Sequence, residues 1–197
     1  VIIAGSELFT GHTMFLTLGV KAGTISRSQM WAILPQTWMG NLLGSVFVAL
    51  LYCWGSGSLL PVDSSLVHTV ALAKTSQSAM ALFFKGALCN WLVCLAIWMA
   101  IRTEGAAKFI AIWWCLLAFI ASGYEHSVAN MTLFALSWFG HHSDAYTLAG
   151  IGHNLLWVTL GNTLSGVVFM GLGYWYATPK SERPAPEKTN ETESLAQ

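Results

Sequence analysis

The sequence predicts an all-α membrane protein that crosses the bilayer several times. Of its 197 residues, 55% are hydrophobic and only 9% are charged, whereas soluble domains carry roughly 25% charged residues. The mean hydropathy is +0.58. Because so few charges cannot cover a water-exposed globular surface, lipid must surround most of the chain. The formal net charge of zero leaves no basic face, which argues against a nucleic-acid partner.

Four long hydrophobic blocks follow a shorter opening segment that ends near Val20. They cover residues 30–54, 78–101, 109–139 and 147–177. Each exceeds the roughly 20 residues that cross a bilayer as a helix, and the third is about ten residues too long for one span. We expect residues 1–178 to form a transmembrane domain. The polar, proline-rich residues 179–197 have no apolar period and are expected to be a disordered tail.

Basic residues indicate which side the tail lies on. If each block crosses once, one side of the membrane holds Lys21, Arg27, Arg102, Lys108, Lys180, Arg183 and Lys188. The loops of the opposite side hold Lys74 as their one basic residue. The positive-inside rule therefore predicts a cytoplasmic C-terminus. The Gly40-x-x-x-Gly44 pair and the glycines at 161, 166, 171 and 173 suggest close contacts between helices.

Two polar interruptions stand in apolar surroundings, "GSELFTGHTMF" at 5–15 and "GYEHSVANMTLF" at 123–134. Each begins with Gly-x-Glu and returns through methionine to phenylalanine, which is typical of a helix broken inside the membrane. A pair of such interruptions indicates a transport site between inverted repeats. We expect the breaks at Gly5, Glu7, Gly123 and Glu125, although the two glutamates are equally well explained as structural caps of half-helices.

An inverted repeat of three plus three helices needs more sequence than these segments provide. The chain opens "VIIAGSELF" without methionine, a basic region or a cleavage site, so the opening is not a signal peptide. We expect that the first helix and the first half of the second are missing from the front.

Two ionisable residues lie inside the apolar blocks. His126 is either a packing histidine with satisfied hydrogen bonds or, as intramembrane ionisable groups usually are, a functional one. Lys85 at a helix centre costs about 2.5–3.5 kcal/mol on insertion scales. Lys85 therefore either extends to the interface, or it supplies positive potential to an incoming anion.

Other classes of function find less support. Glu125 and His126 would point about 100° apart on a helix, and neither His-Glu-x-x-His nor Gly-x-Ser-x-Gly is present, which argues against an intramembrane hydrolase. A haem-binding subunit stays open as an alternative, with candidate axial ligands His12, His68, His126 and His153.

The loop at His141, His142 and Asp144 is expected to be polar rather than metal-binding. Four cysteines in apolar runs are expected to be buried and free: Cys53, Cys89, Cys94 and Cys115. We therefore predict no enzyme activity, no cofactor and no metal.

Four stretches together resemble the formate/nitrite transporter family, most closely its nitrite branch: "GSELFTG", "KGALCNWLVCLAIW", "SGYEHSVANM" and "GNTLSG". The resemblance implies an aquaporin-like fold of six helices, of which the second and fifth are broken. It also implies a homopentamer in the bacterial inner membrane, with one pore in each protomer. The Asn-Pro-Ala signatures of aquaporins themselves are absent.

The resemblance also implies roles for individual residues. His126 is similar to the central histidine that faces the anion, Thr10 to the hydroxyl that bonds it, Asn90 to its amide partner, and Lys85 to the lysine that draws the anion inward. The apolar constrictions above and below the histidine correspond to Leu8, Phe9, Val93 and Phe119.

A mechanism follows from histidine chemistry. An anion that enters an apolar ring loses hydration at a cost of several kcal/mol even after relaxation. Histidine has an ordinary pKa near 6.5, so a proton passed to the anion at His126 would remove its charge. Monovalent weak-acid anions fit this scheme, and chloride does not. We expect nitrite as the substrate and protons as the co-substrate, with formate or hydrosulfide as alternatives.

Overall fold

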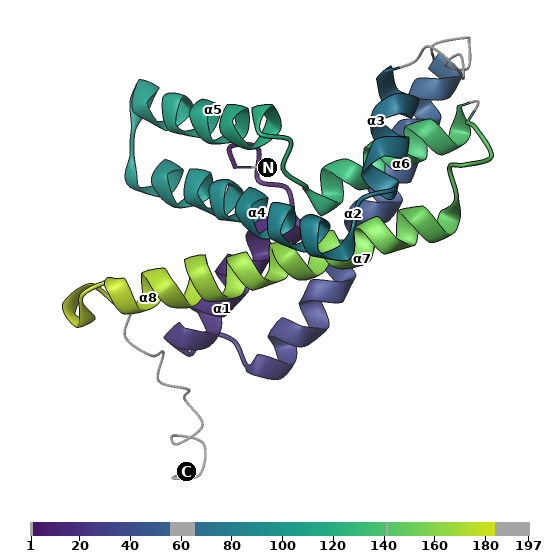
Figure 1. Cartoon of the computed structure of the whole chain (residues 1–197). Coiled ribbons are helices and arrows are strands. Elements are labelled where there is room, and N and C mark those ends of the chain that lie inside the picture. Colours follow the sequence, from purple (N-terminus) through teal and green to yellow (C-terminus); the bar gives the residue numbers. More distant parts are fainter. Residues whose placement is uncertain (1, 56–65, 141, 184–197) are drawn as a thin grey trace.

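The computed structural model describes residues 2–55, 66–140 and 142–183, and all regular structure within them is helical (Figure 1). The helices are α1 (Phe9–Ala22), α2 (Arg27–Gly55), α3 (Leu66–Thr75), α4 (Ala79–Arg102), α5 (Gly105–Ala121), α6 (Ser127–Phe139), α7 (Leu148–Leu164) and α8 (Gly173–Ala177). A π-helical stretch at Ser165–Leu172 joins α7 to α8, and a 3-10 turn follows at Lys180–Glu182. The prediction of an all-α chain is confirmed.

Three helices are long and apolar enough to cross a membrane: Arg27–Gly55, Ala79–Arg102 and Leu148–Ala177. They correspond to three of the four predicted blocks. The fourth block, 109–139, contains two shorter apolar helices, α5 and α6, with residues 122–126 between them outside any helix. The opening segment becomes helical at Phe9.

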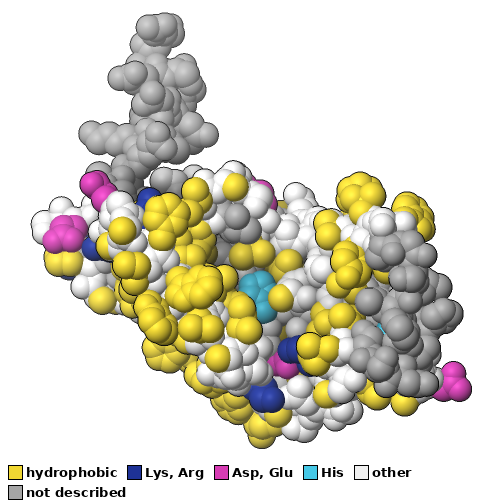
Figure 2. All heavy atoms as spheres, turned by 90° about the horizontal axis from the view of Figure 1, so that it is seen from above, with side chains coloured by type: hydrophobic (Ala, Val, Ile, Leu, Met, Phe, Trp, Pro, Cys, Tyr) yellow, Lys and Arg dark blue, Asp and Glu magenta, His cyan; other side chains and the backbone are white. Residues whose placement is uncertain are grey.

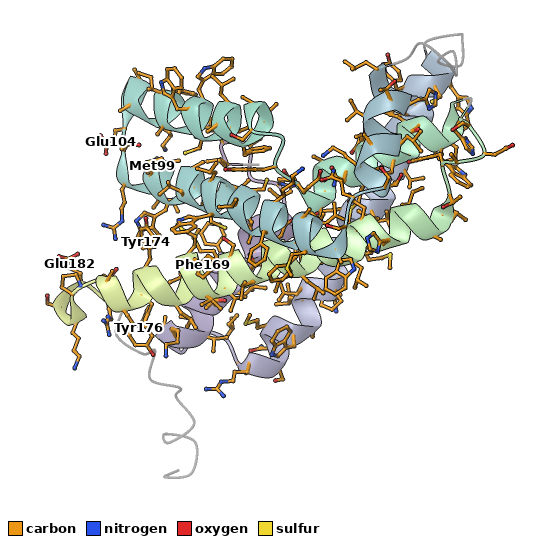
Figure 3. All side chains as sticks on the ribbon, in the orientation of Figure 1. Met99, Glu104, Phe169, Tyr174, Tyr176 and Glu182 are labelled. Carbon is orange, nitrogen blue, oxygen red and sulfur yellow. The ribbon has the colours of Figure 1, made fainter. Side chains whose placement is uncertain are left out.

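Helices α4 and α7 lie side by side along much of their length, and α5 lies against the other side of α4 (Figure 1). Glycine allows the backbones of α4 and α7 to touch, because a Cβ on Gly161 would lie 2.1 Å from the carbonyl oxygen of Phe83. On the α8 side, Tyr174 lies between α8 and α4, with its ring centroid 4.8 Å from that of Trp98 (Figure 3).

The predicted glycine contacts are present at three of the six positions, since a Cβ on Gly40 or Gly44 would meet no atom within 4 Å. A Cβ on Gly166 or Gly171 would collide with Thr13 or Thr17 of α1, as one on Gly161 would with α4. At Gly173 the nearest atom is at an ordinary 3.6 Å. These small residues allow the continuous helix Leu148–Ala177, here called the α7–α8 rod, to pack closely against both α1 and α4.

Much of the outer surface is apolar (Figure 2). Helix α5 alone exposes Phe109, Ile110, Trp113, Trp114 and Ile120. The interior, by contrast, contains several polar side chains, which include Thr10, Asn90, Asn130, Asn154 and Asn162. This arrangement is the reverse of that in a soluble domain and suits a chain that lipid or neighbouring protein surrounds.

The predicted disordered tail, 179–197, lies mostly outside the described residues, which end at Arg183. Two helical features were not predicted from the sequence. One is α3, which ends beside Lys74, and the other is the π-helical stretch after α7.

Candidate substrate site around His126

His126 immediately precedes α6 and caps its first turn. Gly123 turns the chain between α5 and α6 with a φ of 64°, a conformation that favours glycine. His126 is then extended (φ −111°, ψ 114°) and forms the N-cap of α6, with Nδ1 accepting a hydrogen bond from the backbone N–H of Ala129 at 3.2 Å. Since Nδ1 accepts, the ring in its neutral form carries its proton on Nε2.

Thr10 lies in the first turn of α1 and is fully buried. Its Oγ1 is 3.3 Å from His126 Nε2. Because Nδ1 already accepts from the α6 backbone, Nε2–H is the donor to Thr10. The two polar interruptions of the sequence thus meet at one hydrogen bond, which joins the start of α1 to the start of α6.

The Asn90 side chain lies one step behind this pair. Its Nδ2 donates to the carbonyl oxygens of Thr10 at 3.2 Å and Asn162 at 2.6 Å, and to Thr13 Oγ1 at 3.1 Å. Asn90 therefore supports His126 indirectly. It bonds the main chain of Thr10, and Thr10 bonds the histidine ring.

A cavity of about 420 Å³ lies at the ring of His126. Its walls are almost entirely apolar and include Leu8, Val93 and Phe119. The Phe119 ring lies with its centroid 6.0 Å from that of His126. Three of the four predicted constriction residues therefore line one cavity with the histidine. Phe9, the fourth, packs instead in the cluster with Met30 and Leu34.

Glu125 is buried to 1% exposure and has a full set of partners. Lys74 Nζ lies 2.8 Å from its Oε1, Asn130 Nδ2 donates to its Oε2 at 2.6 Å, and Gln77 Nε2 donates to Oε1 at 3.2 Å. A buried carboxylate needs such pairing. The sequence predicts Lys74 only as a loop charge, and nothing in its local sequence indicates that α3 brings it to Glu125.

Lys85 lies beside the same network but does not contact His126. Its Nζ donates to Gln77 Oε1 at 2.7 Å, and its carbonyl oxygen accepts from the Glu125 backbone N–H at 3.3 Å. Figure 2 shows a histidine at the floor of a hollow among hydrophobic side chains, with basic and acidic groups next to it. Because Glu125 neutralises Lys74, the positive charge that this network leaves near the site is that of Lys85.

The glutamates of the two interruptions are not equivalent. Glu7 is largely exposed and forms an ion pair with His12, whose Nδ1 also contacts Thr37 Oγ1 at 3.0 Å. Gly5 turns the chain before Glu7 with a φ of 74°. At this interruption Leu8 is the N-cap residue of α1, the position that His126 has before α6.

The other candidate haem ligands have protein partners. His68 Nδ1 contacts Ser137 Oγ at 2.8 Å, and His153 Nε2 contacts the Gln77 carbonyl oxygen at 3.2 Å. Within residues 2–55, 66–140 and 142–183, no group of three or more His, Cys, Asp or Glu side chains lies close enough to hold a metal ion. All four cysteines are buried, and none of them forms a disulfide.

Comparison with known proteins identifies the family. The sequence profile described as "Formate/nitrite transporter" matches residues 1–176. The chain belongs to the formate/nitrite transporter family. The nitrite transporter NirC of Salmonella typhimurium is 89% identical over 196 residues, which cover 100% of this chain and 73% of that protein. The protein of the same name from Escherichia coli is 85% identical with the same coverage.

Solved structures of the formate/nitrite transporter family agree with this fold. The structure of an "FNT family ion channel" superposes with a TM-score of 0.88 at 91% identity, and the match covers 91% of this chain and 72% of that one. The structure of a "Pentameric formate channel with formate bound" superposes with a TM-score of 0.74 at 27% identity, and the match covers 90% of this chain and 77% of that one.

Proposed function

We propose that this protein carries small monovalent weak-acid anions, nitrite above all, through a pore in each protomer, and that His126 exchanges a proton with the anion. The observation that carries the proposal is the position of His126: its Nε2 bonds Thr10 while its ring lines an otherwise apolar cavity. The names of the two nitrite transporters described above support nitrite, and they favour a transporter over an enzyme.

The starts of α1 and α6 supply part of the stabilisation that a dehydrating anion needs. A hydrogen bond joins Thr10, in the first turn of α1, to His126, the N-cap of α6. The N-terminus of a helix carries the positive end of its dipole, and half-helices that point these ends at a substrate are a recurrent device in transporters. In this proposal each interruption is one membrane helix broken at the level of the site, and Lys85 adds positive potential.

Proton transfer at the site conserves atoms and charge. An imidazolium at His126 gives the Nε2 proton to a nitrite oxygen, which leaves nitrous acid and a neutral imidazole with its proton on Nδ1. A proton taken up from water at Nε2 restores the imidazolium for the next anion. The neutral acid crosses the apolar ring formed by Leu8, Val93 and Phe119 without the cost of a bare charge. The imidazolium needs a proton on Nδ1, and Nδ1 accepts from Ala129 in the neutral state. Charging the ring therefore requires that this hydrogen bond opens.

We further propose a homopentamer in the bacterial inner membrane with a cytoplasmic C-terminus. The pentameric assembly of the formate channel described above supports the homopentamer, and the distribution of lysine and arginine supports the orientation. Five parallel pores would then operate in one assembly.

The test is anion flux in proteoliposomes, with nitrite, formate and chloride compared with and without an imposed pH gradient. We expect nitrite to pass fastest, to respond to the gradient, and to lose that response in His126→Asn. Equal flux of chloride, or an unchanged pH response in the variant, contradicts the proposal. Protein-free liposomes correct for nitrous acid that diffuses through lipid.

Formate is the second candidate, because the pentameric formate channel shares the fold at 27% identity. Hydrosulfide, a third weak-acid anion, is compared in the same assay. The ratios of the initial fluxes at one pH rank the substrates directly. An absorption spectrum of the purified protein decides the haem alternative, since a haem subunit shows a Soret band and a channel without haem does not.

A further inference from the structure

Asn162 holds the main chain on both sides of His126. Its Oδ1 accepts from the backbone N–H of Ser127 at 3.0 Å, and its Nδ2 donates to the carbonyl oxygen of Glu125 at 3.1 Å. The same Nδ2 donates to the Gly86 carbonyl oxygen of α4 at 2.8 Å. Asn162 is fully buried, so these bonds are protected from water. One amide side chain of α7 therefore fixes the break between α5 and α6 and anchors it to α4.

Asn41 of α2 does the same at the other interruption. Its Oδ1 accepts from the backbone N–H of Phe9 at 2.9 Å, and its Nδ2 donates to the carbonyl oxygen of Glu7 at 3.0 Å. The residue held between these two bonds is Leu8. Each asparagine follows a glycine in the sequence, in "GNLLG" (40–44) and "GNTLSG" (161–166).

The shape of a primary amide explains why both breaks use asparagine. In extended backbone, the carbonyl of residue i and the N–H of residue i+2 point to the same side. A carboxamide offers one donor and one acceptor next to each other and so bonds both groups at once. The held residues have nearly the same extended conformation, Leu8 with φ −126° and ψ 120° and His126 with φ −111° and ψ 114°.

Both held side chains line the same cavity of about 420 Å³, Leu8 as part of its apolar wall and His126 as its titratable group. We call each pair of asparagine bonds a clamp, that of Asn162 across His126 and that of Asn41 across Leu8. The two clamps are also connected. Asn90 donates to the carbonyl oxygen of Asn162 and to that of Thr10, two residues after Leu8. The histidine and the constriction are thus positioned by equivalent devices on α7 and α2, with Asn90 between them.

We propose that Asn162 and Asn41 are a duplicated pair of positioning residues, one of which sets the place of His126 and the other the place of Leu8 in the pore. This inference rests on the proposed function for its transport readout, and on main-chain hydrogen bonding alone for its structural readout. The two asparagines have different effects. Asn162 controls how the imidazole of His126 meets the anion, whereas Asn41 controls the width of the apolar constriction.

The experiment compares Asn162→Asp with Asn41→Asp in the full-length membrane protein. Aspartate has the size of asparagine and keeps the acceptor, but it replaces the donating amide with an oxygen that faces a carbonyl oxygen. For Asn162→Asp we expect about tenfold lower maximal nitrite flux and a shifted pH profile, since a buried bond is lost beside His126. For Asn41→Asp we expect an unchanged pH profile and a raised ratio of chloride to nitrite flux.

Thr159→Val is the matched control on α7. Thr159 accepts a hydrogen bond from Trp38 Nε1 at 3.0 Å, less than one turn before Asn162, and touches neither break. This variant loses a hydrogen bond on the same helix, so we expect its flux and pH profile to equal those of the wild type. A shifted pH profile in Thr159→Val would overturn the assignment to Asn162.

Amide hydrogen exchange supplies a readout that does not depend on transport. In Asn162→Ala we expect faster exchange at Ser127 with unchanged protection at Phe9, and in Asn41→Ala the reverse. Unchanged exchange at both amides, or identical pH profiles in the two aspartate variants, overturns the proposal. If no Asn162 variant keeps the wild-type assembly size, Asn162 is needed for folding and the positioning role is rejected. If wild-type protein carries no nitrite while the exchange pattern holds, the proposed function fails and the clamps stand.

Discussion

The backbone N–H of Ala129 donates to Nδ1 of His126, so the ring that lines the cavity is also the N-cap of α6. The proton of the neutral ring is therefore directed to Thr10 through Nε2. A second proton on Nδ1 would face the Ala129 N–H and the positive end of the helix dipole. Charging the ring and capping the helix are thus competing uses of one nitrogen atom.

Two replacements of His126 separate these uses. Asparagine is a strong N-cap residue but does not titrate, whereas leucine does neither. We expect both variants to lose the rise of nitrite flux with falling pH, since neither replacement titrates as histidine does. We expect only His126→Leu to lose about 1 kcal/mol of stability through the missing cap, measured by thermal unfolding in detergent. Equal stability of the two variants would contradict the capping role.

Thr10→Val removes the hydroxyl that accepts from His126 Nε2 and keeps the side-chain volume. A net hydrogen bond is worth about 0.5–1.5 kcal/mol, so we expect up to roughly tenfold lower nitrite flux at saturating substrate. Flux is measured in proteoliposomes at several pH values. The control is Thr163→Val, because Thr163 bonds only its own helix, at the Thr159 carbonyl oxygen. Wild-type flux in Thr10→Val would show that the Thr10–His126 bond does not serve transport.

Lys74 and Lys85 differ in what they hold, and their glutamine variants should differ accordingly. Lys74→Gln leaves Glu125 buried without its ion-pair partner, so we expect a loss of about 3–5 kcal/mol of stability. Lys85→Gln replaces a bond to the neutral Gln77 side chain, and we expect a stability change within about 1 kcal/mol. If Lys85 attracts the anion, its variant raises the KM for nitrite, most clearly at low salt. Unfolding curves and flux against nitrite concentration measure both effects.

Gly123 lies in the break between α5 and α6, and Gly105 at the start of α5 is its matched control. Both have positive φ, 64° and 57°, and at neither position would a Cβ meet an atom within 4 Å. Alanine at either site should cost about 1–2 kcal/mol through left-handed backbone strain alone. Only Gly123→Ala should alter nitrite flux, since Gly123 shapes the segment that carries His126. Similar flux in both variants would indicate that the break tolerates this strain.

Sequence patterns predicted the features that depend on local composition. Apolar length located α2, α4 and the α7–α8 rod, and polar residues in apolar surroundings located both interruptions. The link between Thr10 and His126 came from family resemblance, because residues so far apart in the chain have no local signal of contact.

What the sequence did not reveal depends on partners distant in the chain. Glu125 was ambiguous between capping and function because its partner Lys74 arrives on α3, a short helix without a strong pattern. Asn41 and Asn162 each follow a glycine, and comparing the two Gly-Asn pairs would have given a signal for the clamps. Phe9 was placed at the constriction by resemblance, whereas its position one residue after the extended Leu8 directs it to Met30 and Leu34.

The π-helical stretch Ser165–Leu172 gives this part of the chain an unusual tolerance of changes in length. A π turn holds one residue more than an α turn, so deleting a single residue there lets the helix close into regular α-helix. Because the wider turn had absorbed the extra residue, the helix beyond the deletion keeps nearly the same phase, and the face that carries Gly171 stays turned toward Thr17 of α1. The same deletion within α4 would rotate everything beyond it by about 100°. A one-residue deletion in the π-helical stretch is therefore less damaging than one in α4.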